Sequence, residues 1–184
     1  MIAHVLLISL AVTYATSPPH VDPPRPEPSK CPHDESLAGL DMTKMEGKWH
    51  VAAVTTTIPL EIRGQAKPIE GQTVTITGKP GEYRLVHSLG KSKPFTHEYT
   101  IVQEEREINA YIAEQVNELK FAVVATDYDN VALIVTCEQS YTHHRVARVL
   151  VRHSAGDHQR HLDQMYEHLP ARGIKIEDME KVEM

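Results

Sequence analysis

Short runs of alternating apolar and polar residues dominate the chain between residues 47 and 153. A period of two is typical of strands that bury one face, and clusters of Gly, Pro, Asn and Asp separate the runs. In the clearest run, residues 72–78, Val74 and Ile76 fall on one face and threonines fall on the other. The pattern predicts eight strands, over residues 48–56, 72–78, 82–88, 95–103, 107–114, 118–126, 130–138 and 143–153.

No helical pattern interrupts these runs, so consecutive strands are expected to pair as antiparallel neighbours. Eight such strands fit an up-and-down barrel or a two-sheet sandwich. The first connection, residues 57–70, is long and partly apolar. Connections of this length in compact domains are often functional lids, which suits a barrel with one open end; a sandwich loop that packs on itself is the equal alternative at this point. The predicted fold class is all-β, an eight-stranded antiparallel up-and-down β-barrel.

The period changes to that of a helix after residue 156, where Leu162, Met165 and Leu169 share one face. We expect one amphipathic C-terminal α-helix at about residues 156–170, with Pro170 and Gly173 near its end. The last predicted strands are apolar on both faces, which indicates that something covers their outer side. The helix is the expected cover. The acidic tail, residues 177–184, is expected to fray.

The N-terminus has the pattern of a secretory signal peptide followed by a proline-rich arm. An apolar stretch at residues 5–12 precedes small residues, and cleavage is expected near Ala15. The stretch is shorter than the roughly 20 apolar residues of a membrane-spanning helix, so no transmembrane segment is predicted. The expected organisation is a signal peptide at 1–15, a flexible proline-rich arm at 16–32 and the barrel domain at 33–184. The alternatives are a buried N-terminal strand and an arm that binds a proline-recognising module.

Composition and charge indicate one globular domain without a nucleic-acid partner. The 184 residues are 41% hydrophobic and 24% charged, ordinary fractions for a domain of this length. Acidic residues outnumber basic ones by 25 to 19, and no run of consecutive Lys and Arg occurs. The electrostatic basis of nucleic-acid binding is therefore missing.

The chain has 2 cysteines, Cys31 and Cys137. Disulfides persist in oxidising compartments, so in a secreted protein these two are expected to pair. The bond would close a loop of about 100 residues, to which the chain-entropy treatment assigns roughly 4–5 kcal/mol. Without secretion, the two would be buried thiols.

Three separated motifs carry a family resemblance. They are a G-x-W on the first strand, a T-D-Y before the seventh strand and an arginine that closes the eighth; their residues are Gly47, Trp49, Thr126, Asp127, Tyr128 and Arg152. In this order, with eight strands and one C-terminal helix, the chain resembles the lipocalins over roughly residues 31–181. The stretch at 125–137 is similar to the apolipoprotein D branch, in which a cysteine after this strand is bonded to one ahead of the G-x-W. Cys31 and Cys137 occupy those two places.

The motif residues have a physical role at the narrow end of a barrel. An eight-stranded barrel leaves room for one small ligand, and Trp49, the single tryptophan, is large enough to plug its base. Arg152 over the indole face would add a cation–π contact of about 0.5–2 kcal/mol. The alternatives are a generic core aromatic and a solvated strand end.

Alternation from Trp49 onward predicts an apolar interior. A lining of this kind suits a lipid-like or aromatic small molecule held by burial, and plain packing in a filled barrel is the alternative. The predicted ligand-binding residues are Val51, Ala53, Val74, Ile76, Tyr83, Leu85, Ile108, Ile112, Phe121 and Val123.

The remaining chemistry is sparse. The chain has 12 His, for which solvated positions are favoured over a metal site, and no metal or other cofactor is predicted. No G-x-S-x-G, H-E-x-x-H or P-loop motif occurs, so no enzymatic activity is expected. The leading hypothesis is a secreted, extracellular transport protein that carries or sequesters a small hydrophobic ligand. The alternatives are a signalling or defence protein whose loops bind a partner such as a cell-surface receptor, and a haem- or tetrapyrrole-binding protein that uses His87 or His97.

Overall fold

Nine strands and one α-helix make up the part of the chain that the computed structural model describes, residues 35–55, 70–91, 94–104, 107–112, 118–138 and 145–184. The strands are β1 (Gly47–Thr55), β2 (Thr73–Lys79), β3 (Glu82–Leu89), β4 (Phe95–Glu104), β5 (Glu107–Ile112), β6 (Glu118–Thr126), β7 (Val131–Glu138), β8 (Arg145–Val151) and β9 (Met179–Lys181). The helix is α2 (Gln159–Tyr166), followed by 3₁₀ turns η1 (Pro170–Arg172) and η2 (Ile176–Asp178).

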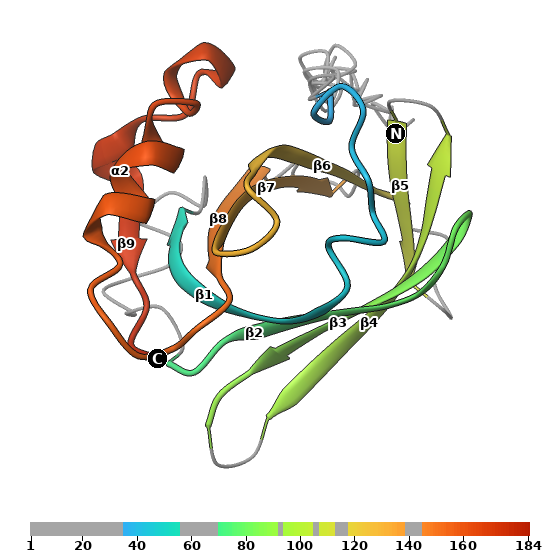
Figure 1. Cartoon of the computed structure of the whole chain (residues 1–184), viewed down its shortest axis with the longest axis horizontal. Helices are drawn as coiled ribbons and strands as arrows, with labels where there is room; N and C mark the ends of the chain where they lie inside the picture. The colour runs from blue at the N-terminus through green and yellow to red at the C-terminus, as the bar shows by residue number, and fades with distance from the viewer. Residues whose placement is uncertain (1–34, 56–69, 92–93, 105–106, 113–117, 139–144) are drawn as a thin grey trace, which may run out of the picture.

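The sheet closes on itself. Strands β2 to β8 pair antiparallel in chain order, and β1 pairs with β8 on one side and with β2 on the other. Figure 1 shows the strands curling around a common interior. The predicted up-and-down β-barrel is therefore confirmed, and the two-sheet sandwich is excluded.

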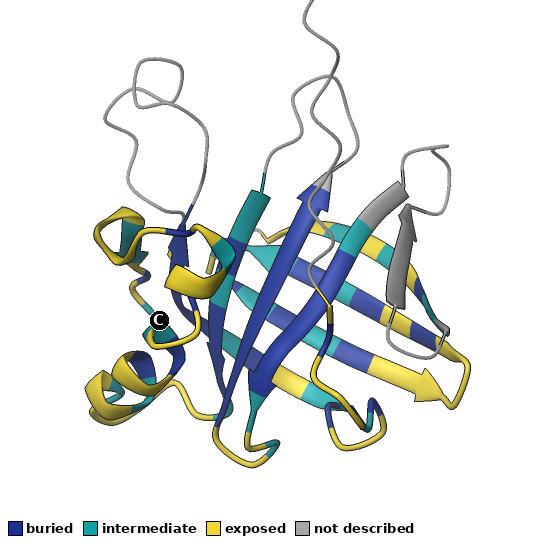
Figure 2. Cartoon of the chain, turned by 90° about the horizontal axis from the view of Figure 1, so that it is seen from above, coloured by how far each residue is buried: buried dark blue, intermediate teal, exposed yellow. Residues whose placement is uncertain are grey.

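Two apolar layers hold the barrel together. One fills the lower interior around Trp49, and the other lies between the outer wall and α2, where Leu162 and Met165 pack with Ala147 and Val149. All seven residues from Val131 to Cys137 are buried, whereas β2 and β3 largely alternate between buried and more exposed positions. Figure 2 shows both patterns, with unbroken dark blue on some strands and mixed colours on others. The predicted outer helix is confirmed, although the α-helix proper begins at Gln159 and ends at Tyr166.

The C-terminal tail is ordered, so the expectation that it frays is wrong. Strand β9 pairs with β1, beyond the segment of β1 that pairs with β2. Val182 is 5% exposed and its N–H donates to the carbonyl of Ala52 at 3.0 Å. The Gly71 N–H also donates to the carbonyl of Glu183 at 2.7 Å. The apolar side chain and the free edge of β1 together offset the charge of the tail.

Several predicted features lie outside the described residues. These are the signal peptide at 1–15, the proline-rich arm at 16–32, Cys31 and nearly all of the first long connection. The domain boundaries therefore stay predictions.

Replacing Val182 with Ser tests the docking of the tail. Full burial of a valine contributes about 1.5–3 kcal/mol, so the free energy of unfolding is expected to fall by about 1–3 kcal/mol in urea titrations followed by circular dichroism. Glu183→Ser is the control, because Glu183 is exposed and uses only its backbone carbonyl. Equal stability of the two variants would show that burial of the Val182 side chain contributes nothing.

The barrel interior as the candidate binding site

The floor of the barrel is built around Trp49. Its side chain is 0% exposed, and the indole Nε1 donates to the carbonyl of Met45 at 2.8 Å. Met42 and Met45, from the segment that precedes β1, belong to the same buried cluster. Opposite Trp49 in the register lies Val74 on β2. Large side chains therefore fill this end of the interior.

Arg152, just after β8, holds the floor from below. Its guanidinium carbon lies 3.7 Å from the centroid of a Trp49 ring. Its nitrogens donate to three backbone carbonyls, those of Tyr128 at 3.1 Å, Glu46 at 2.7 Å and Lys44 at 2.8 Å. Desolvation lowers the pKa of Arg152 from its ordinary value, and nearby carboxylates oppose this shift. The side chain stays cationic at neutral pH and links three segments that are distant in sequence.

Gly47 is required by this arrangement. Its φ angle is 103°, a backbone conformation that residues other than Gly rarely adopt. A Cβ placed on it would also lie 3.0 Å from Arg152 Nη1. The glycine of the G-x-W thus leaves space for the arginine that covers the tryptophan.

The T-D-Y segment is a tight turn that presents the Tyr128 carbonyl to Arg152. Thr126 Oγ1 donates to the Val131 carbonyl at 2.9 Å and accepts from the Tyr128 N–H at 2.8 Å. Asp127 accepts from the backbone N–H groups of Asn130 and Val131 at 2.8 and 2.9 Å. Desolvation alone would raise the pKa of Asp127, but these hydrogen bonds outweigh it and the pKa is lowered. Tyr128 itself has φ of 66°.

Most of the predicted lining residues lie together. Seven of them belong to the inner cluster, namely Val51, Val74, Ile76, Tyr83, Leu85, Phe121 and Val123. Ile108 pairs with Phe121 and Ile112 with Tyr99 in the strand register. The side chains of Ile108 and Ile112 lie outside the described residues.

The prediction that Ala53 lines the interior is wrong, because Ala53 packs in the outer cluster under α2. The β1–β8 register runs Val51 to Leu150 and then Ala53 to Val149, which leaves Ala52 as an extra residue between them. A bulge of this kind shifts the alternation by one position. Val54 takes the inward position instead.

The sequence named His87 as a candidate interior residue but not Arg148 and Thr136, which lie in the interior as well. Thr136 and His87 are buried, and Arg148 Nη1 donates to Thr136 Oγ1 at 3.1 Å. His87 Nε2 lies 3.3 Å from Gln72 Oε1; because an amide oxygen only accepts, His87 donates this hydrogen bond. Alternation along β8 was the signal that could have found Arg148, since it stands between Val146 and Leu150 on the face that points inward.

Burial decreases along the interior away from the floor. Trp49, Ile76, Ile101 and Leu150 are all 0% exposed. Farther along the same strands, the inward-facing residues Tyr99, Val146 and Arg148 are only partly buried. Among the described residues, the interior is thus filled at the floor, and farther along it the partly exposed Tyr99, Val146 and Arg148 stand among buried neighbours such as Phe121 and Thr136.

Burial also changes the ionisation of His87. Desolvation, with smaller contributions from the charges of Arg148 and His97, lowers its pKa to about 3. His87 is therefore neutral at physiological pH, and the charge within this part of the interior is that of Arg148.

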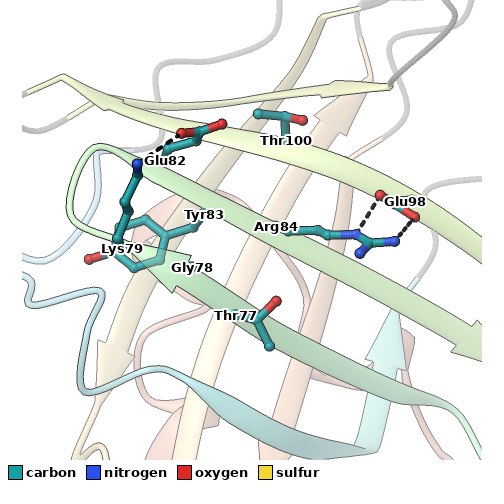
Figure 3. Close-up of a pocket in the computed structure, with 8 residues that line it drawn as sticks. All are labelled: Thr77, Gly78, Lys79, Glu82, Tyr83, Arg84, Glu98 and Thr100. Atoms are coloured by element: carbon teal, nitrogen blue, oxygen red, sulfur yellow. Dashed lines mark hydrogen bonds and ion pairs between the residues drawn. The ribbon is translucent and has the colours of Figure 1, made fainter.

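A depression also lies on the outer surface of β2, β3 and β4 (Figure 3). Apart from buried Tyr83, its lining residues are exposed and mostly polar, and Arg84 forms an ion pair with Glu98 there. Lys79 lies 3.8 Å from Glu82. Charges that neutralise one another on an open face leave no strong preference for a ligand.

Within the described ranges, no three His, Cys, Asp or Glu side chains gather as metal ligands would. No helix in the same ranges has the length and apolar character needed to span a bilayer. Cys137 is buried on β7, while Cys31 lies outside the described residues, so their pairing stays a prediction.

Solved lipocalin structures share this architecture. Lipocalin 12 from rat epididymis is similar with a TM-score of 0.64 and 16% identity, over 78% of this chain and 85% of that one. The cockroach major allergen Per a 4 has a TM-score of 0.62 and 19% identity, over 83% and 94%. Lobster apocrustacyanin A1 has a TM-score of 0.60 and 9% identity, over 78% and 79%.

These likenesses show the lipocalin fold, so the resemblance inferred from the G-x-W, T-D-Y and arginine motifs is confirmed at the level of the fold. No protein-family model matches the sequence, and no curated protein matches it.

Truncating Trp49 tests the floor. Trp49→Ala is expected to lower the free energy of unfolding by about 3–5 kcal/mol, the range for large buried aromatic side chains. Urea denaturation gives the value. A loss below about 1 kcal/mol would contradict a structural role for the indole at the floor.

His87 predicts a pH dependence of stability. Its pKa is about 3 in the folded state against an ordinary 6.5, so the unfolded chain takes up the proton first. The stabilisation from neutral His87 is complete above the ordinary pKa and is lost as the pH falls towards the folded value. Between pH 7 and 4.5 the wild type is expected to lose about 2 kcal/mol more than His87→Gln in urea titrations. His153→Gln, at an exposed site, is the control. Equal losses in wild type and His87→Gln would contradict the assignment.

Proposed function

We propose that the protein is a carrier that binds a small hydrophobic molecule inside the barrel and performs no chemistry on it. The observation that supports this most directly is the loss of burial along the interior. Packing is complete around Trp49, while Tyr99, Val146 and Arg148 remain partly accessible although they face inward. A barrel filled only for stability would bury such side chains throughout.

The surroundings of this accessible region suit an apolar ligand. Phe121 is 3% exposed and Leu85 is 5% exposed, so rigid apolar walls flank it. Removing apolar surface from water contributes about 25 cal/mol per Å². A few polar groups then orient the molecule, as is common in small-molecule sites.

The lipocalin fold supports the same proposal without identifying the ligand, because one fold serves many functions. The solved siderocalin Ex-FABP, with a TM-score of 0.61 and 14% identity over 77% of this chain and 95% of that one, is described as functioning through dual ligand specificities. We propose for this chain only that a ligand binds inside the barrel, and we do not transfer the ligands of Ex-FABP to it.

An extracellular location belongs to the proposal. The apolar stretch at 5–12 supports export, and the two cysteines suit an oxidising compartment. A Cys31–Cys137 bond would tie the segment ahead of the barrel to β7. Secretion from expressing cells and intact-mass measurement before and after reduction test both points.

Native mass spectrometry of protein purified from the cells that express it tests the carrier function. We expect a stoichiometric small molecule, and a rise in melting temperature when it is added back to stripped protein. A ligand at 100 times its Kd stabilises the folded state by about 2.7 kcal/mol, which shifts Tm by several degrees.

Filling the accessible region gives a sharper arm of the same test. Val146→Phe places bulk inside the barrel, and Val86→Phe places the same bulk at a partly buried position on β3 that faces away from the inner cluster. We expect only Val146→Phe to abolish the ligand-dependent rise in Tm. An empty protein from cells, together with no Tm shift in a panel of fatty acids, alcohols and steroids, would refute the carrier function.

A further inference from the structure

Arg148 is an inward-facing cation in the interior. Its neighbours on β8, Ala147 and Val149, belong to the outer cluster under α2. Alternation therefore directs Arg148 to the opposite face. Its partners in the register are Val54 on β1 and Ile134 on β7, and both belong to the inner cluster. The charge is thus placed between apolar neighbours.

The guanidinium of Arg148 is incompletely paired. Nη1 donates to Thr136 Oγ1 at 3.1 Å, whereas Nε is shielded from solvent and has no hydrogen-bond partner. No carboxylate in the described part of the chain forms an ion pair with it. By contrast, the guanidinium nitrogens of Arg152 donate to three carbonyls, and Arg84 is paired with Glu98.

The described residues of the opposite wall supply no compensating anion. Arg148 interacts electrostatically with His87 on β3 and Tyr99 on β4, and at neutral pH a histidine with a pKa of about 3 and a phenol are both uncharged. Desolvation lowers the pKa of Arg148 to about 10. The side chain is therefore still charged at physiological pH. A desolvated charge without a counter-ion is unfavourable, so its presence here calls for a partner.

Thr136 satisfies only one side of the guanidinium. The threonine hydroxyl donates to the Val146 carbonyl at 3.3 Å and accepts from Nη1, which fixes one side of the Arg148 plane. The opposite edge, Nε with Nη2, makes no hydrogen bond to the described residues. Two parallel N–H groups in one plane match the two oxygens of a carboxylate.

We propose that Arg148 binds the carboxylate of an amphiphilic ligand, so that the carrier selects fatty-acid-like molecules over neutral or cationic ones of the same length. The inference rests on the proposed function and specifies its ligand class. The headgroup accepts from Nε and Nη2 of Arg148. The apolar part of the molecule packs against Val146 and Phe121, which lie near Arg148 and Thr136 in the register.

The experiment compares decanoate, decanol and decyltrimethylammonium, which share one chain and differ in head charge. Binding to the stripped full-length protein is measured by isothermal titration calorimetry and by the shift in Tm. Wild type is expected to bind decanoate roughly ten- to hundredfold more tightly than decanol, the range for a hydrogen-bonded charged group. The cation is expected to bind most weakly.

Three variants assign the preference. Arg148→Gln is expected to bind decanoate and decanol equally, and Arg148→Lys is expected to keep part of the preference because it keeps the charge. Arg145→Gln is the matched control. It removes an arginine from the same strand whose guanidinium donates to the Arg172 carbonyl at 2.7 Å on the outer side, and it should retain the wild-type preference.

Arg148→Met separates a binding role from a structural one. Replacing an unpaired desolvated charge with an apolar side chain is often neutral or stabilising. The Tm of the ligand-free variant is therefore expected to equal or exceed that of wild type. A large fall in Tm would make Arg148 a structural residue and overturn the proposal.

The outcomes distinguish the carboxylate site at Arg148 from the carrier function. Equal binding of decanoate and decanol by wild type would overturn the carboxylate site and leave the carrier function intact. A preference that persists in Arg148→Gln would also overturn it, because another group would then bind the head. Failure of all three probes, together with no co-purifying molecule, would refute the carrier function itself.

Discussion

The stacking of Arg152 on Trp49 is the interaction on which the closed end of the barrel depends. The cation lies 3.7 Å from the ring centroid and donates to the carbonyls of Tyr128, Glu46 and Lys44. Hydrogen bonds from a charged donor are stronger than neutral ones, and shielding from water strengthens them further. One side chain thereby fixes the segment before β1, the first strand and the turn before β7. With that end fixed and filled, the inward-facing side chains that stay partly exposed, Tyr99, Val146 and Arg148, lie farther along the strands.

Arg148 and Arg152 are close in the sequence but differ in how far protein groups offset the desolvation of their charge. Arg152 is surrounded by carbonyl oxygens and an aromatic face, so its desolvation is offset within the fold. Arg148 has one threonine hydroxyl and an unpartnered Nε. Stability alone does not account for the second arrangement, since an apolar residue at this position would pack without leaving a charge unpaired. Residues whose burial is unfavourable in the empty protein are commonly those that meet a ligand.

The sequence predicted the features that depend on local pattern. Eight strand positions, the outer helix and the three motif groups follow from alternation, helical spacing and short spacings that any reader can count. The prediction failed where a bulge shifts the two-residue alternation of a strand. Ala53 moved to the outer layer because Ala52 is an extra residue in β1, and no residue type marks such a bulge. The tail was predicted to fray because only its charge was considered. The buried contact of Val182 with the edge of β1 was not foreseen. Arg148 was overlooked because an arginine in a strand is most often exposed, and the alternation that places it beside Val146 and Leu150 was not followed along β8.

The gradient of burial also fixes the direction in which a carboxylate ligand would lie. Leu150, two residues from Arg148 towards the floor, is 0% exposed, as are Trp49 and Ile76. Val146, two residues in the other direction, is partly buried. An apolar chain attached to a head at Arg148 therefore finds no room towards the floor and extends past Val146, away from it. The charged end then lies deepest, where desolvation strengthens its attraction to the guanidinium, and the tail lies nearer the end remote from Trp49. In this orientation head charge would govern selectivity more strongly than chain length, because the part of the molecule that varies in length is the part least confined by the floor.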